Sequence, residues 1–204
     1  MNDFFADRRP HNGLTYETYR EEWKEQQDRS PGPEMDKEER KMLHYLRYNW
    51  RRQAEVHRAY EPSQELKEAL AAIDEPQLWM VLTEPWCGDS AFLLPVLAEA
   101  AERSDQVTFR ILHRDEHLDI MDQYLTGGSR SIPKLVVFDA DGEERFQWGP
   151  RPSGAAERFA ELRGSDLTKE QQIQQLIEYY EDGGWEEVDA ELTAAVSAAA
   201  APAA

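Results

Sequence analysis

The apolar positions follow two periods, and each predicts a kind of element. Residues 77–83 (QLWMVLT) form a continuous apolar run rich in β-favouring side chains, which predicts a buried strand. Residues 90–101 then place apolar side chains at helical spacing around Pro95, which predicts a kinked helix. A strand is therefore expected to lead directly into a helix. The same reasoning predicts a strand at 107–113, a hairpin turning at 139–142, and helices at 62–73, 117–125 and 155–163.

Charged segments flank this central part. Residues 16–27 and 36–60 favour helix and are separated by the breaker Ser30-Pro31-Gly32-Pro33. The second helix should pack against the domain or a partner chain, because apolar side chains share one of its faces: Leu43, Leu46, Trp50 and Ala54. Residues 168–188 predict an acidic helix interrupted by two glycines. The alanine-rich residues 194–204 are expected to fray.

The only cysteine, Cys87, lies where the strand of 77–83 ends and the next helix begins. Read as a C-x-x-C pair, the motif is incomplete, because Ser90 occupies the place of the second thiol. An internal cycle between dithiol and disulfide is therefore excluded.

Together these residues resemble the thioredoxin superfamily. Pro95 follows Cys87 at the offset found in thioredoxins, and Ile132-Pro133 is similar to their Ile-Pro pair, whose cis bond lies against the active cysteine. A bacterial branch of that superfamily shares three motifs with this chain: Trp86 to Asp89 followed by a small residue, Asp122 to Lys134, and Trp148 to Pro152. The resemblance implies an α/β, thioredoxin-like fold with a central mixed β-sheet of four or five strands flanked by helices.

The 204 residues leave room for one ordinary domain with additions. We expect an N-terminal helical extension over residues 1–60 and a thioredoxin-like domain over 61–165. Residues 166–204 should form a C-terminal acidic helix and a disordered alanine-rich tail. Because no run of signal-peptide or membrane-spanning length is evident, a cytoplasmic location is expected.

The net charge is −18, and residues 61–204 hold eleven basic against twenty-nine acidic side chains. Such a surface disfavours nucleic acid and anionic membranes. The acidic surface would either steer a basic partner toward the protein or serve only as a solvated acidic shell. We expect the second. The oligomeric state is left open.

The position of Cys87 at a helix start should lower the pKa of its thiol, whereas the carboxylate of Asp89 should raise it. We therefore expect a moderately activated thiol, to which Ser90 donates a hydrogen bond. Trp86 is expected to cover the sulfur, and Ile132 and Pro133 to shape a substrate groove. The opposing interpretation is that a lone cysteine is a buried small hydrophobe.

Residues 113–117 (HRDEH) combine imidazoles and carboxylates, but they cross from a strand into a turn, so no metal site is expected. Arg114 and Asp115 should instead lie on the same sheet edge as Cys87 and modulate it. Three cations could form a basic rim for glutathione carboxylates, or be ordinary surface charges: Arg130, Lys134 and Arg151. The aromatic residues Trp79, Phe138 and Trp148 are expected in the core.

The sequence is compatible with two functions. The first is a monothiol thiol-disulfide oxidoreductase in cell redox homeostasis, acting on a protein or small-molecule disulfide, with Cys87 and Ser90 as catalytic residues. It needs no bound cofactor, but an external thiol such as glutathione must complete its cycle. The second is a non-catalytic thioredoxin-like module that binds a protein or peptide.

Overall fold

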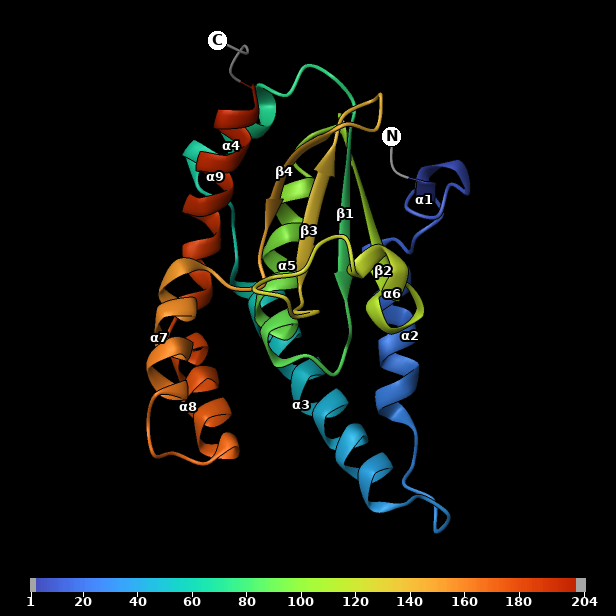
Figure 1. Ribbon diagram of the computed structural model, residues 1–204, viewed down its shortest axis with the longest axis vertical. Helices are drawn as coiled ribbons and strands as arrows, with labels where there is room; N and C mark the ends of the chain where they lie inside the picture. The colour runs from blue at the N-terminus through green and yellow to red at the C-terminus, as the bar shows by residue number, and fades with distance from the viewer. Residues whose placement is uncertain (1–2, 201–204) are drawn as a thin grey trace.

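The computed structural model describes residues 3–200 and centres on a four-stranded mixed sheet (Figure 1). The strands lie in the order β2 (Val107–His113), β1 (Gln77–Thr83), β3 (Lys134–Phe138) and β4 (Glu144–Trp148). β1 pairs parallel with β2 and antiparallel with β3, which pairs antiparallel with β4. The expected α/β class with a central mixed sheet is confirmed.

β1 is the central element, and six of its seven residues are buried. This explains why its sequence is apolar throughout rather than alternating, since both faces of the sheet are covered. Helix α5 (Gly88–Ala101) follows β1 after a short loop and packs along the sheet with Pro95 inside it. Trp79, Phe138 and Trp148 are buried, as expected.

The helices around the sheet mostly match the sequence pattern. Ser63 caps α4 (Gln64–Ala71) by accepting a hydrogen bond from the backbone of Leu66, and α7 (Ser153–Arg163) follows β4. The helix expected at 117–125 is wrong in length, because α6 spans only Leu118–Met121. Beyond it the backbone N–H of Tyr124 bonds to the carbonyl of Met121, a tighter turn that buries the tyrosine ring.

The N-terminal segment forms α1 (Asp3–Ala6), α2 (Tyr16–Asp28) and α3 (Lys37–Ala59). α3 packs against both α2 and α5. Leu43 and Leu46, on the face singled out in the sequence, are buried, and Trp23 donates to the carbonyl of Leu46 at 3.1 Å. This segment is therefore a layer of the fold rather than a separate appendage.

The C-terminal segment forms α8 (Lys169–Glu181), a short 3₁₀ turn η2 (Gly184–Glu186) and α9 (Glu187–Ala200). The expectation of a disordered alanine-rich tail is wrong as far as Ala200. α9 contacts α4, and Val188, Leu192 and Val196 repeat at four-residue spacing and are buried. Residues 201–204 lie outside the described residues. In the part from 3 to 200, no helix combines the length and apolarity needed to cross a bilayer.

Candidate functional site

The sulfur of Cys87 lies at the start of α5, and the side chain is 7% exposed. Its thiol donates to the carbonyl oxygen of Ile132 at 3.3 Å, and the peptide bond between Ile132 and Pro133 is cis. The fold thus brings together two motifs that are 45 residues apart. A thiol makes this bond only in its protonated form.

Burial and, to a smaller extent, the nearby charge of Asp89 raise the pKa of Cys87 to about 11. Hydrogen bonds from Ser90 and the charge of Arg151 oppose this rise without cancelling it. The expected moderate activation is therefore wrong for this structure. The favourable field of the helix start is outweighed by the loss of solvent around the sulfur.

Ser90 is fully buried and stands three residues after Cys87, at the position of the second cysteine in a C-x-x-C motif. The hydroxyl of Thr83 donates to Ser90 Oγ at 2.7 Å. Since that oxygen accepts from Thr83, its own proton is free to point to the sulfur, and Ser90 lowers the pKa of Cys87. Ser90 can stabilise a thiolate but carries no sulfur to form a disulfide.

Asp89 is buried in an ion pair with Arg151, which donates to its two oxygens at 2.9 and 2.6 Å. The hydroxyl of Tyr180, from α8, donates to Asp89 at 2.9 Å. Burial raises the pKa of Asp89, while Arg151 and Tyr180 hold it down. Sequence reasoning missed Tyr180, because it lies 91 residues from Asp89 and no local pattern connects the two.

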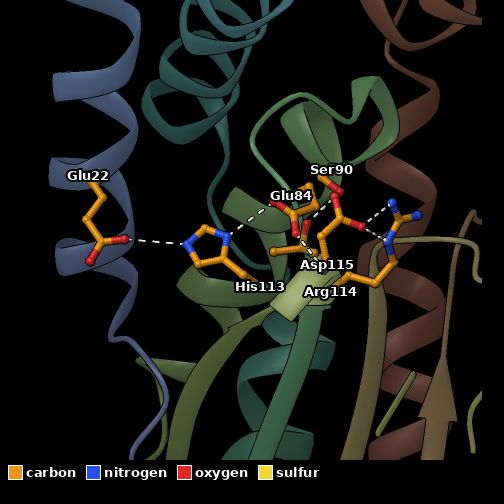
Figure 2. Close-up of polar contacts among 7 residues, drawn as sticks. Glu22, Glu84, Ser90, His113, Arg114 and Asp115 are labelled. Carbon is orange, nitrogen blue, oxygen red and sulfur yellow. Dashed lines mark hydrogen bonds and ion pairs between the residues drawn. The ribbon is translucent and has the colours of Figure 1, made fainter. Parts of the chain in front are cut away.

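A second polar network lies on the other side of the loop that precedes Cys87. Figure 2 shows His113 between Glu84 and Glu22, at 3.3 and 3.4 Å. Glu84 is 6% exposed and also accepts from the backbone N–H of Asp115 at 2.8 Å. The hydrogen bond with Glu84 is the main reason why the pKa of His113 is raised. Glu84 and Glu22 were not predicted, and they tie the loop to β2 and α2.

Trp86 is half-buried, and the guanidinium of Arg114 lies 4.9 Å from the centre of its ring. Arg114 also donates to Asp115 at 2.9 and 2.7 Å and to the carbonyl of Arg130 at 3.0 Å. Arg114 and Asp115 therefore lie on the same edge as the cysteine, as expected from the end of β2. Their role in tuning Cys87 stays a prediction.

The three cations considered as a basic rim do not gather on one rim. Arg130 is exposed and pairs with Asp122 at 2.6 Å, and Arg151 is engaged with Asp89. Lys134 is buried, and burial lowers its pKa. This arrangement gives no support to a common site for glutathione carboxylates.

Helix α3 also holds the loop before Cys87. The side-chain amide of Asn49, which is 1% exposed, donates to the carbonyl of Pro85 at 3.1 Å. A cavity of about 630 Å³ opens beside the loop and is lined by residues that include Glu22, Trp86 and His113. Within residues 3–200, no three His, Cys, Asp or Glu side chains are placed to hold a metal ion.

The family model described as Thioredoxin matches residues 35–163. An HIV epitope-scaffold protein is 17% identical, with a TM-score of 0.60 over 93% of this chain and 95% of that chain. A Pseudomonas aeruginosa protein of unknown function is also 17% identical, with a TM-score of 0.58 over 93% and 95% of the two chains. At this identity both likenesses concern the fold alone. No curated protein matches the sequence.

Proposed function

The chain belongs to the thioredoxin family, and from this premise we propose that it is a monothiol thiol-disulfide oxidoreductase acting through Cys87 in cytoplasmic redox homeostasis. The observation that carries the proposal is the position of the sulfur. Cys87 lies at the start of α5, 3.3 Å from the carbonyl of Ile132, with the Ser90 hydroxyl as a hydrogen-bond partner. Hydrogen bonding by Ser90 lowers the pKa of Cys87, so this residue favours the thiolate that the reaction needs.

The reaction has two exchange steps. The Cys87 thiolate attacks one sulfur of a disulfide R–S–S–R′, forms the mixed disulfide Cys87–S–S–R, and releases R′–S⁻. An external thiolate such as glutathione then attacks the sulfur of R, forms a new disulfide with R, and returns Cys87 as a thiolate. Ser90 stabilises the attacking and leaving thiolate by its hydrogen bond. The external thiol supplies the electrons that a second cysteine would otherwise provide.

The buried sulfur of Cys87 must become accessible before it can react. With a pKa of about 11, only about one Cys87 in ten thousand is a thiolate at neutral pH. Displacing the Ile132 carbonyl from the thiol and admitting water would bring that pKa down, because burial is its largest cause. A disulfide that docks beside Pro133 would displace the carbonyl of Ile132 from the thiol.

The second candidate is a thioredoxin-like module that binds a protein or peptide without chemistry. Its support is the same burial, since a thiol that is 7% exposed and has no thiol partner can also serve as a packing residue. The two candidates differ in turnover and not in fold.

The experiment measures turnover of a small mixed disulfide in a glutathione-coupled assay, beside an insulin-reduction assay driven by thioredoxin reductase. We expect activity in the first assay and almost none in the second. Cys87→Ser should abolish the activity, because a hydroxyl is a far poorer nucleophile than a thiolate. Ser90→Cys should introduce dithiol behaviour, whereas Ser197→Cys, on the exposed side of α9, should not.

The wild-type chain decides between the two candidates. Absence of turnover with every thiol donor, together with no iodoacetamide labelling of folded Cys87, would reject the oxidoreductase. The binding module would then be the better account.

A further inference from the structure

One face of α3 is positively charged although the protein is strongly acidic. Residues 40–58 hold six basic side chains and one acidic side chain, while the whole chain carries −18. Arg40, Arg47 and Arg58 donate to main-chain carbonyls rather than to carboxylates. Of these six cations, Arg52 alone pairs with a carboxylate within residues 3–200. Most of the positive charge on α3 is therefore not neutralised inside the chain.

Two tyrosines project between these cations. Tyr45 is 37% exposed and Tyr48 is 41% exposed. The Lys41 ammonium lies 5.9 Å from the centre of the Tyr45 ring, and the Arg51 guanidinium lies 4.5 Å from that of Tyr48. Positions 41, 45, 48 and 52 share one helix face. We name Lys41, Tyr45, Tyr48, Arg51 and Arg52 the α3 stripe. Tyrosine and arginine are the side chains that most often dominate binding at protein interfaces.

α8 offers the complementary surface. Residues 166–191 hold nine acidic side chains and one basic side chain. Glu170, Gln174 and Glu178 are exposed on one side of α8, with Ile173, 40% exposed, among them. We name these four residues the α8 face. At the last residue of α8, Glu181 already pairs with Arg52 at 3.4 Å, so α3 and α8 make a contact of this kind within one chain.

We propose that the α3 stripe docks on the α8 face of a second copy of this chain. α8 and the N-terminal half of α3 project separately beyond the same end of the sheet (Figure 1). A twofold axis parallel to these two projecting helices would place the α3 of each copy beside the α8 of the other copy. Both contacts then form at once, which closes the dimer and leaves neither surface unpaired.

The opposite charges meet at contact distance, whereas the net negative charges of the two copies repel over a longer range. Ions screen exposed charges over about 8 Å at physiological ionic strength. Self-association should therefore be strongest at moderate salt, where the long-range repulsion is screened and the contacts are kept. This proposal does not rest on the redox proposal, since its argument uses only the charges and the exposure of the α3 stripe and the α8 face.

Charge exchange tests the proposal. Lys41→Glu/Arg51→Glu reverses two of the three charges of the α3 stripe, and Glu170→Lys/Glu178→Lys reverses both charges of the α8 face. Each variant alone should lose self-association by roughly a hundredfold or more, because like charges then face each other. An equimolar mixture should form a heterodimer, because both of its contacts are again complementary. The regained binding also shows that each variant is folded.

Sedimentation velocity measures these masses against the monomer of 23.6 kDa. Lys67→Glu/Arg163→Glu changes the net charge as much as the stripe variant does, at α4 and α7, and should still dimerise. A wild type that stays monomeric at moderate salt would overturn the proposal, and so would a mixture that fails to associate. Binding of poly-glutamate to a monomeric wild type, lost in the stripe variant, would reassign the stripe to a foreign acidic partner.

Discussion

Asn49→Ala tests whether α3 holds the loop that carries Cys87. The Asn49 amide donates to the carbonyl of Pro85 at 3.1 Å in a buried position, two residues before the cysteine. Alanine leaves this carbonyl without its donor, and an unsatisfied buried acceptor costs about 1–3 kcal/mol. The open state of the loop does not contain the bond, so the cost falls on the closed state alone.

Iodoacetamide reports on this opening, because the buried sulfur reacts only in molecules whose loop is open. A cost of 1–3 kcal/mol raises the opening equilibrium, and with it the alkylation rate, by about 5- to 150-fold. Glu55→Ala, at an exposed position of the same helix, should alkylate at the wild-type rate.

Urea unfolding must be measured beside the alkylation, since it separates local opening from global loss of stability. If Asn49→Ala lowers the free energy of unfolding but alkylates at the wild-type rate, α3 supports the fold without holding the loop. If wild-type Cys87 already alkylates as fast as a free cysteine, the burial itself is refuted.

Three further outcomes are expected. Trp50→Ala should cost about 3 kcal/mol or less, because the ring, 5.8 Å from that of Trp23, is only half-buried; faster proteolysis between residues 30 and 60 checks this. The wild type should lose roughly 2–3 kcal/mol of stability relative to Cys87→Ala as pH rises from 9 to above 11, since ionisation of the thiol favours the unfolded state there; urea unfolding measures it. Glu84→Gln should lower the raised pKa of His113 in an NMR titration, and an unchanged pKa would exclude Glu84 as its cause.

The local elements could be predicted because their signals are local. β1 and β2 begin and end where the apolar runs do, and α5 begins next to Cys87. The prediction for the alanine-rich end of the chain was wrong, because its composition is typical of a frayed tail whereas its apolar residues have helical spacing. Leu192 and Val196 are four residues apart, which is the interval of a helix face, and that signal could have found α9.

The chemistry of the site could not be predicted in the same way. The sign of the Cys87 pKa shift depends on how completely other elements exclude water from the sulfur, and this is a property of tertiary packing. The partners of Asp89 and Glu84 come from α8, β2 and the segment after β4. No short-range pattern connects such residues before the chain has folded.

The bond between Tyr180 and Asp89 has a consequence for the order of biosynthesis. Chains emerge from the ribosome with the N-terminus first, so the segment around Cys87 is exposed long before Tyr180, 91 residues after Asp89, has been made. During that interval Asp89 lacks the hydrogen bond from Tyr180, although Arg151, its other partner, has already been made. Tyr180 is therefore the last residue of the site to be synthesised, and docking of α8 completes the hydrogen bonding of the carboxylate beside Cys87.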